Sequence, residues 1–215
     1  MLSKKYVIGH GALLDWAMAS WTEVTPEQAL EAIDVGQDGN YRFDLSALAN
    51  VSPKDATAFV AWGPQFLNFR RLELMGELKT RGFKMPALVC RGALVAASAT
   101  LGENCAIGAA AVVGTSCKIG FNSVVGAAAL IGNGVHLGPS VWIADGAQIG
   151  SGARVGANSM LGRGVILNDG VTVGRQCILD IPGQRLTQLA DKNFFNVSFP
   201  NGITVLDGGG ANEFS

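Results

Sequence analysis

The chain has 215 residues, of which 48% are hydrophobic, and this is enough for a buried core in one or two domains. Charged residues make up only 15%, the net charge is −1, and no run of Lys or Arg occurs, which excludes the basic footprint of a nucleic-acid-binding protein. Glycine is in excess at 29 residues but lacks the three-residue period of collagen, so another repeat must account for it.

The first 86 residues are expected to form a small α/β domain. Its elements follow in the order strand, helix, strand, helix, over residues 5–8, 12–20, 57–62 and 65–81. This order is typical of parallel, Rossmann-like sheets, in which ligands bind beyond the carboxyl ends of the strands. Gly9-His10-Gly11 forms the turn after the first strand, and a glycine turn that opens a helix is suited to binding phosphate.

No segment predicts export or a membrane span. Residues 1–7 lack the apolar core and cleavage site of a secretory signal. Residues 119–144 carry no Asp, Glu, Lys or Arg, but their regular glycines and their polar Asn and Ser residues argue against a span. We therefore expect a cytoplasmic protein that does not insert into membranes.

From Val89 onward the sequence has a six-residue repeat. An aliphatic residue occupies every sixth position, sixteen times in succession from Val89 to Leu179, and is usually followed by glycine, with a small residue four positions after it. This period fits a hexapeptide β-helix, in which three hexads form one triangular coil. We expect a parallel β-helix of about five coils over residues 87–181, with glycine adopting the backbone conformation of the turns.

The C-terminal residues 182–215 are expected to form a cap and a tail. Residues 183–195 are predicted to form a short helix over the open end of the β-helix, and residues 208–215 to be mobile.

The 18-residue coil sorts the outward side chains into three columns. One column is polar and basic: Thr100, Lys118, His136, Arg154 and Thr172. Two columns are apolar: Ala106, Val124, Trp142, Met160, Ile178, and Leu94, Val112, Leu130, Gln148, Ile166. Apolar stripes of this length are a liability on a monomer, so we expect these faces to associate in a closed homotrimer.

The cysteines are expected to be structural. Cys90, Cys105, Cys117 and Cys177 show no C-x-x-C spacing, and the last three fall on the small inward position of the repeat. We expect reduced thiols, no disulfide and no metal.

Three features together identify a resemblance. They are the early strand with Gly9-His10-Gly11, the strand, turn and helix over residues 57–82 with Arg71, and the hexads from Val89. Over about residues 4–180 the chain resembles the nucleotide-sugar acetyltransferases of the sialic-acid and bacillosamine type, which join a small N-terminal α/β domain to a left-handed parallel β-helix. The resemblance implies a role in the synthesis of surface glycans such as lipopolysaccharide.

The resemblance also implies the ligands and their contacts. The N-terminal domain would hold the uridine diphosphate of an amino sugar, acetyl-coenzyme A would lie between neighbouring β-helices, and the active site would sit at the subunit boundary. The implied substrate contacts are Gly9, His10 and Gly11 near the diphosphate, Asp34 near the uridine, and Arg71. The implied contacts of acetyl-coenzyme A are Trp142, Gly150, Ser151 and Gly156.

The catalytic corner departs from that family. The family usually has a histidine and an acidic residue where this chain has Asn133 and Gly134, and its second histidine aligns with Trp142. Acyl transfer to a hydroxyl needs a general base, whereas an amine has a useful free-base fraction near neutrality and can attack a thioester directly. The sequence therefore favours N-acetylation, with Asn133 orienting the amine or donating to the oxyanion.

Other catalytic candidates and other functions stay open. His136 lies three residues beyond Asn133 on an outward strand position, and Asp169 lies two coils away, roughly 10 Å at strand spacing. Lys118 and Arg154 are placed to attract the phosphates of the coenzyme.

The alternative function is a non-catalytic trimeric β-helix that binds ligands or acts as a scaffold. An acyltransferase that uses acyl carrier protein also remains possible, whereas a zinc hydratase needs three histidines and the chain has two.

Overall fold

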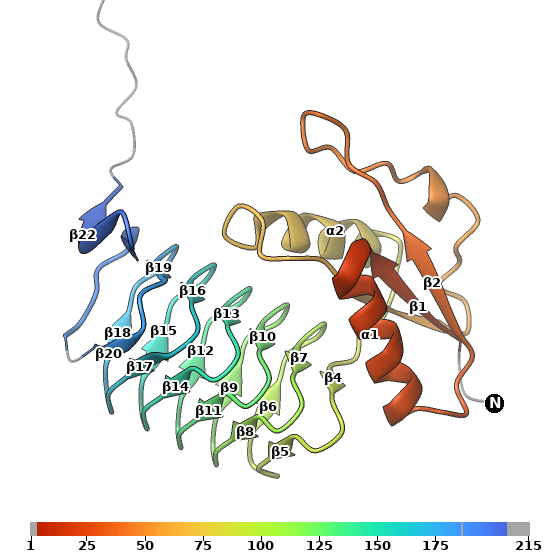
Figure 1. Cartoon of the computed structure of the whole chain (residues 1–215). Coiled ribbons are helices and arrows are strands. Elements are labelled where there is room, and N and C mark those ends of the chain that lie inside the picture. Colours follow the sequence, from red (N-terminus) through yellow and green to blue (C-terminus); the bar gives the residue numbers. More distant parts are fainter. Residues whose placement is uncertain (1–3, 186, 206–215) are drawn as a thin grey trace, which may run out of the picture.

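The computed structural model describes residues 4–185 and 187–205, which form a small α/β part and a β-helix side by side (Figure 1). The elements of the α/β part are β1 (Lys4–Gly9), α1 (Gly11–Val24), β2 (Leu30–Asp34), a 3₁₀ turn (Ser46–Leu48), β3 (Ala56–Ala61) and α2 (Phe69–Thr80). The three strands are parallel in the order β2-β1-β3. The expected parallel sheet is confirmed.

Two details of this part differ from the expectation. The strand β2 was not predicted, because it is an edge strand in which only Ile33 is buried and its hydrophobic signal is weak. The helix α2 begins at Phe69 rather than at residue 65. Phe66, Leu67 and Asn68 all have left-handed backbone conformations, with φ of 49°, 56° and 65°, and a right-handed helix cannot include them.

From Leu88 the chain forms three sheets of very short parallel strands, which are the three faces of a triangular solenoid. The β4 face consists of β4 (Leu88–Val89), β7 (Ala106–Ile107), β10 (Val124–Val125), β13 (Trp142–Ile143), β16 (Met160–Leu161) and β19 (Ile178–Leu179). The β5 face consists of β5 (Leu94–Val95), β8 (Val112–Val113), β11 (Leu130–Ile131), β14 (Gln148–Ile149), β17 (Val165–Leu167) and β20 (Gly183–Arg185). The β6 face consists of β6 (Thr100–Leu101), β9 (Lys118–Ile119), β12 (His136–Leu137), β15 (Arg154–Val155) and β18 (Thr172–Val173).

The 18-residue register is confirmed on all three faces. Val124 pairs with Ala106 and Trp142, and Leu130 pairs with Val112 and Gln148. The aliphatic and small residues of the hexads fill the interior in one continuous core. Three cysteines occupy the inward positions expected for them: Cys105, Cys117 and Cys177. Burial raises the pKa of these three thiols.

The glycine after each aliphatic residue has a different role from the one expected. These glycines do not have positive φ angles; the left-handed positions lie two residues later, as at Ala128 and Gly146, with φ of 54° and 67°. At Gly126 a Cβ would lie 2.6 Å from the backbone nitrogen of Asp145 in the next coil. Glycine is therefore required by the close stacking of the coils rather than by the turn conformation.

The solenoid has more coils than expected and ends differently. The β5 face has six strands, against the expected five or so coils. The helix predicted over residues 183–195 is wrong: Leu189 bridges to Val173, and Phe195 pairs with Leu179. This last coil is 16 residues long rather than 18, so its sequence does not show the six-residue repeat. Its apolar side chains nevertheless pack on the core. The region predicted to be mobile, residues 208–215, lies outside the described residues.

The last strand of this final coil forms an antiparallel hairpin with the strand that follows it. The hairpin consists of β21 (Asn193–Asn196) and β22 (Phe199–Thr204) and extends the β4 face beyond β19. None of the helices in the two described ranges has the length and hydropathy that a membrane span requires.

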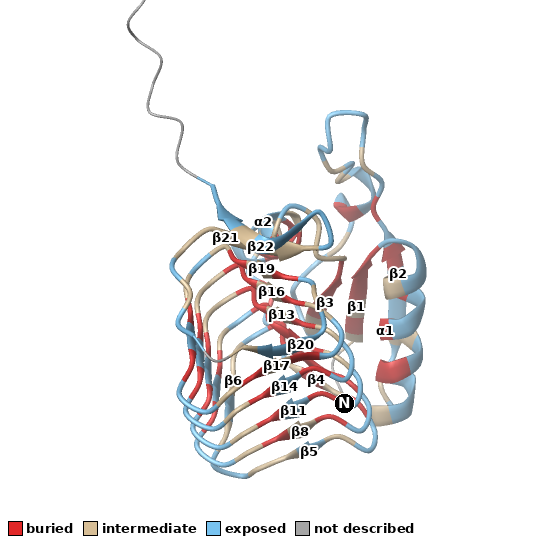
Figure 2. Cartoon of the chain, turned by 60° about the vertical axis from the view of Figure 1, so that its left-hand side comes forward, coloured by how far each residue is buried: buried red, intermediate tan, exposed pale blue. Residues whose placement is uncertain are grey.

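The α/β part covers one end of the β4 face (Figure 2). Leu14, Ala17 and Phe59 form a cluster with Ala106 and Val124, which are 1% and 9% exposed. One of the two apolar columns is therefore covered in part by the chain itself, which corrects the expectation that both are open along their whole length. The other column remains open, with Leu94 and Leu130 66% and 45% exposed.

The stacking role of glycine gives a test of the fold. Gly126→Ala should lower the free energy of unfolding by about 3 kcal/mol, because the backbone atoms that its Cβ meets cannot move without shifting a coil. Gly146→Ala is the matched control, because nothing lies within 4 Å of its Cβ and Ala128 already adopts that conformation one coil earlier. Its expected cost is about 1 kcal/mol. Equal shifts of the two midpoints in urea unfolding would contradict the stacking explanation.

Candidate active site

A buried arginine holds the two parts of the chain together. Arg71 of α2 is 2% exposed, and its guanidinium donates to the carbonyl and side-chain oxygens of Asn122 and to the carbonyl of Asn104, on one corner of the solenoid. It also donates to the carbonyl of Val60, whose own N–H donates to the side chain of Asn104 at 2.8 Å. Burial lowers the pKa of Arg71 to about 10, so it remains charged at neutral pH.

The left-handed loop before α2 reinforces this junction. The side-chain amide of Asn68 donates to the carbonyl of Ser140 at 2.7 Å, and that of Asn158 donates to the carbonyl of Leu67 at 3.0 Å. Asn122 and Ser140 are also linked directly at 3.0 Å. One polar corner of the solenoid, between the β6 and β4 faces, thus fixes the position of α2 and of the carboxyl end of β3.

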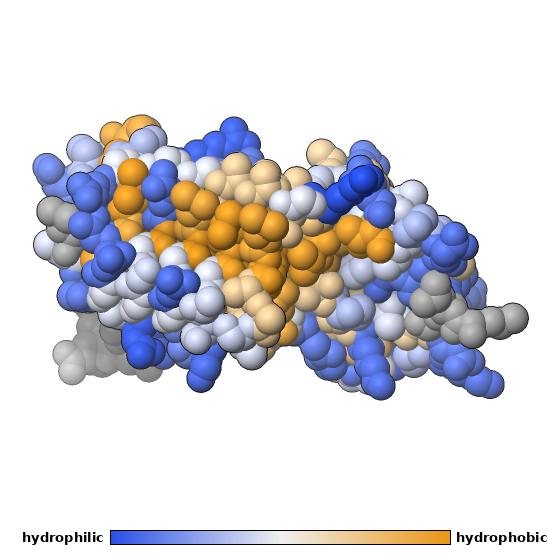
Figure 3. All heavy atoms as spheres, turned by 90° about the horizontal axis from the view of Figure 1, so that it is seen from below, coloured by the Kyte–Doolittle hydropathy of each residue, from blue (hydrophilic) through white to orange (hydrophobic). Residues whose placement is uncertain are grey.

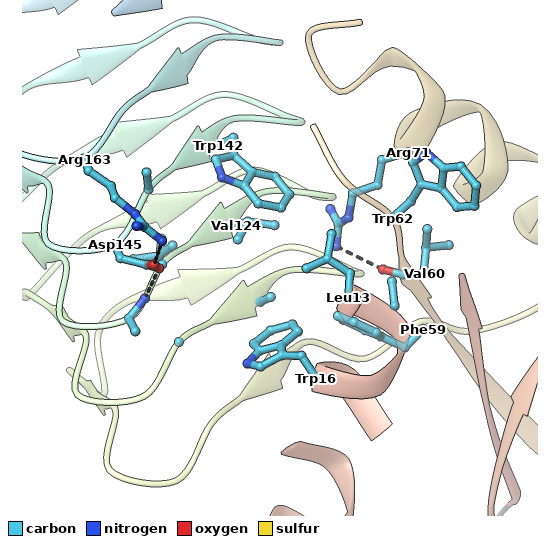
Figure 4. A pocket seen from close by; sticks show the side chains of 17 residues that line it. Leu13, Trp16, Phe59, Val60, Trp62, Arg71, Val124, Trp142, Asp145 and Arg163 are labelled. Atoms are coloured by element: carbon cyan, nitrogen blue, oxygen red, sulfur yellow. Dashed lines mark hydrogen bonds and ion pairs between the residues drawn. The ribbon is translucent and has the colours of Figure 1, made fainter. Parts of the chain in front are cut away.

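This junction leaves a cavity of ≈ 490 Å³ between α1, β3 and the β4 face (Figure 4). Its walls are mainly apolar and include three tryptophans: Leu13, Trp16, Phe59, Trp62, Val124 and Trp142. Asp145 and Arg163, which form an ion pair at 2.9 Å, supply charge at the solenoid side. The cavity suits a ligand with an apolar or ring-shaped body.

A histidine and a carboxylate meet beside this cavity, at the carboxyl ends of β1 and β2. The Nδ1 atom of His10 lies 2.7 Å from Oδ1 of Asp34, and both side chains are exposed. The imidazole also lies 6.2 Å from the ring of Trp62, measured between ring centroids. The structure therefore brings together His10 and Asp34, two of the residues singled out in the sequence, whereas Trp142, a third, lines the cavity.

The two glycines that flank His10 have different roles: one allows close strand packing and the other leaves the start of α1 open to a ligand. A Cβ at Gly9 would lie 2.0 Å from the carbonyl oxygen of Ala61, so glycine is needed there for β1 and β3 to lie side by side. Gly11 has φ of 56° and open space around it, and α1 starts at this residue without an acidic side chain in its first turn. Its first N–H groups are consequently available to an anion.

A second group of candidates lies on another corner of the solenoid, between the β5 and β6 faces. Oδ1 of Asn133 accepts hydrogen bonds from the backbone and the hydroxyl of Thr115, at 2.9 and 3.1 Å. The N–H of Asn133 donates to the hydroxyl of Ser151, whose N–H donates to Asp169 at 2.7 Å. Each polar side chain thus caps the corner of the preceding coil, and the Nδ2 group of Asn133 has no partner among the described residues.

This corner borders an open groove of ≈ 670 Å³ along the β5 face. The groove is lined by Leu130, Asn133, Gly150, Ser151, Ile166 and Asp169. At Gly150 a Cβ would lie 2.5 Å from the backbone nitrogen of Asp169, so this glycine also serves coil stacking.

Two of the sequence candidates lie apart from both the cavity and the Asn133 corner, and a third, Arg71, borders the cavity without a free terminal nitrogen. His136 is exposed on the β6 face, paired in register with Lys118 and Arg154. Gly156 packs against the next coil, where a Cβ would lie 2.6 Å from the nitrogen of Arg175. Arg71 borders the cavity, but its two terminal nitrogens are fully used by the hydrogen bonds of the junction, which assigns it a structural role instead of the implied substrate contact.

Sequence reasoning missed the walls of the cavity. Leu13 is a half-buried residue of α1, Trp16 is an exposed residue of the same helix, and Trp62 directly follows β3. Large apolar residues that recur on one side of a helix and at the end of a strand were the available signal. In residues 4–185 and 187–205, no group of three or more His, Cys, Asp or Glu side chains is arranged to hold a metal ion.

The chain matches known proteins in its repeat and in its fold. The family model "Bacterial transferase hexapeptide (six repeats)" matches residues 122–157. No curated protein is significantly similar to the chain in sequence.

Solved structures match both parts of the chain. The acetyltransferase domain of PglB from Neisseria gonorrhoeae matches with a TM-score of 0.76 and 23% identity, over 89% of this chain and 95% of that one. PerB from Caulobacter crescentus, solved with CoA and GDP-perosamine, matches with a TM-score of 0.77 and 22% identity, over 90% and 94%. WeeI from Acinetobacter baumannii matches with a TM-score of 0.61 and 18% identity, over 89% and 95%.

These likenesses confirm the two-part fold, a solenoid β-helix preceded by a small α/β part, that the sequence resemblance implied. They also include a perosamine N-acetyltransferase with a histidine replaced by asparagine, again in complex with CoA and GDP-perosamine.

The structural role of Arg71 gives a second prediction. Arg71→Met should lower the free energy of unfolding by about 3–5 kcal/mol, because it removes a buried charged donor from the carbonyls of Val60, Asn104 and Asn122. Arg70→Lys, a neighbouring change in an exposed ion pair with Glu73, should cost less than about 1 kcal/mol. Thermal or urea unfolding measures both. A fully stable Arg71→Met protein that no longer binds substrate would show that Arg71 is a ligand-binding residue after all.

Proposed function

We propose that this chain, which shares the two-part fold of sugar N-acetyltransferases, moves an acetyl group from acetyl-CoA to the amino group of a nucleotide-linked sugar. The nucleotide is UDP in this proposal, and the protein works as a homotrimer in the cytoplasm. The observation that carries the proposal is the combination of this fold with a ring-sized cavity beside an open helix N-terminus.

The first turn of α1 is the proposed site for the diphosphate. Its N–H groups point away from the helix without internal partners, and the partial positive charge of a helix N-terminus favours phosphate. Asp34, exposed at the end of the neighbouring strand, is placed to accept a hydrogen bond from the nucleoside. The sugar would then extend into the cavity, against Trp16, Trp62 and Trp142.

The proposed trimer follows from the positions of the cavity and of the Asn133 corner. The cavity and Asn133 lie on different corners of one solenoid, so a single chain does not bring them together. The open apolar column with Leu94 and Leu130 lies beside Asn133, and a band of apolar residues follows the length of the solenoid (Figure 3). In a ring of three, this face of one copy would pack on the β4 face of the next and bring Asn133 to a neighbour's cavity.

The chemistry of the proposed site does not require a histidine at the corner. The amine of the sugar attacks the thioester carbonyl as the free base, the C–N bond forms, and the C–S bond then breaks to release CoA. The free Nδ2 group of Asn133 donates a hydrogen bond to the oxyanion, while its Oδ1 is held by Thr115. Trp142, Gly150 and Ser151 would line the path of acetyl-CoA between neighbouring solenoids.

Thiol release from acetyl-CoA tests this function. UDP-, dTDP- and GDP-linked amino sugars would be compared with their hydroxyl analogues, and we expect turnover of a UDP-linked amine but not of its hydroxyl partner. Asn133→Ala should lower kcat about 100-fold by removing an oxyanion donor. Thr172→Ala, an exposed change on the β6 face, should leave kcat unchanged.

Two other results would overturn parts of the proposal. If only the GDP-linked amino sugar is acetylated, the protein is specific for guanine nucleotides and the proposed UDP specificity is wrong. Nucleotide binding without turnover of any acceptor would favour the alternative, a non-catalytic binding or scaffold protein in which Asn133 has replaced the catalytic histidine.

A further inference from the structure

The proposed reaction leaves a proton without an acceptor. When a neutral amine adds to a thioester carbonyl, the nitrogen of the adduct carries a positive charge and must lose a proton before the amide is complete. Asn133 cannot accept it, because an amide has no basic nitrogen. A base must therefore come from elsewhere in the chain or from solvent.

Among the described residues, few charged or titratable groups near the cavity are able to accept this proton. Arg71 is a donor only, and its terminal nitrogens are occupied by carbonyls. Asp145 is paired with Arg163 and also accepts a hydrogen bond from the N–H of Ala127 at 3.0 Å. His136 lies on the β6 face, away from the cavity.

His10 has the geometry that these groups lack. The carboxylate of Asp34 only accepts hydrogen bonds, so the 2.7 Å contact makes Nδ1 of His10 the donor and leaves the lone pair on Nε2. Asp34 thereby fixes both the tautomer and the orientation of the ring, as an orienting carboxylate does for a general base. The side chain of His10 is 62% exposed, so Nε2 is accessible to a ligand.

The imidazole also stands next to the cavity. Leu13, three residues further along α1, and Trp62, whose ring centroid is 6.2 Å from that of His10, both line it. The indole nitrogen of Trp62 donates to Gln65 at 3.3 Å, which fixes the ring that lies near His10 and lines the cavity.

We infer that His10, oriented by Asp34, is a catalytic residue that accepts the proton of the attacking amine; the inference rests on the function proposed above. In this step the C–N bond forms, Nε2 takes one proton from the nitrogen, and the C–S bond breaks. The imidazolium then gives the proton to the departing thiolate, so the base is regenerated. The α/β part would thus supply the base that the solenoid corner lacks.

Four variants of the full-length protein test this inference, with kcat, KM and the Kd for the nucleotide sugar measured separately. His10→Gln and His10→Ala should lower kcat about 100- to 1,000-fold and leave Kd within about threefold. Asp34→Asn should lower kcat less, because the ring remains but its tautomer is no longer fixed. Glu31→Gln is the matched control, since Glu31 is a carboxylate of another exposed ion pair on the same strand and should behave as wild type.

Chemical rescue separates a base from a binding residue. Added imidazole should restore at least about tenfold of the lost kcat in His10→Ala and nothing in Asn133→Ala. A rise in Kd with kcat unchanged would overturn the inference and make His10 a phosphate ligand, and so would a loss of kcat that imidazole does not restore. If the wild-type protein transfers no acetyl group to any acceptor, the proposed function fails and the inference with it, whereas normal turnover by His10→Gln refutes the inference alone.

Discussion

The stacking of coils at a fixed 18-residue interval is the constraint on which the rest of the structure depends. It brings backbone atoms of successive coils so close that a Cβ at Gly126 would meet the next coil at 2.6 Å, and it fills the interior with the aliphatic and the small residue of each hexad. It also sorts the outward side chains into columns, since Leu130 must lie between Val112 and Gln148. The positions of Asn133 and of the cavity on separate corners follow directly from this register.

The buried guanidinium of Arg71 turns this rigid solenoid into part of a site. Its hydrogen bonds to Asn104 and Asn122 join α2 and β3 to one corner, so the space between α1 and the β4 face is held open as a cavity. In the described ranges this buried charge has no carboxylate partner and relies on carbonyl acceptors. Because those acceptors meet the guanidinium only in the observed arrangement, the hydrogen bonds stabilise that single arrangement of the two parts. The polar corner therefore determines where His10 and Trp62 lie relative to the solenoid.

The sequence predicted what depends on periodicity and missed what depends on three-dimensional packing. The solenoid, its columns and the inward cysteines were readable because each coil repeats the same environment for Cys117 or Val125. The 16-residue last coil, the edge strand β2 and the left-handed start of α2 leave no such pattern. Arg71 was singled out as a substrate contact because nothing in a sequence distinguishes an arginine that binds carbonyls from one that binds a ligand.

The central claim is that one active site forms from the cavity of one copy and the Asn133 corner of the next. Mixing two inactive variants after unfolding and refolding them together tests it most directly: Leu13→Trp, which fills the cavity, and Asn133→Ala. If the site is shared, random assembly into trimers should restore about a quarter of the wild-type sites. Acetyl transfer that stays at the level of the separate variants would contradict a site shared between copies.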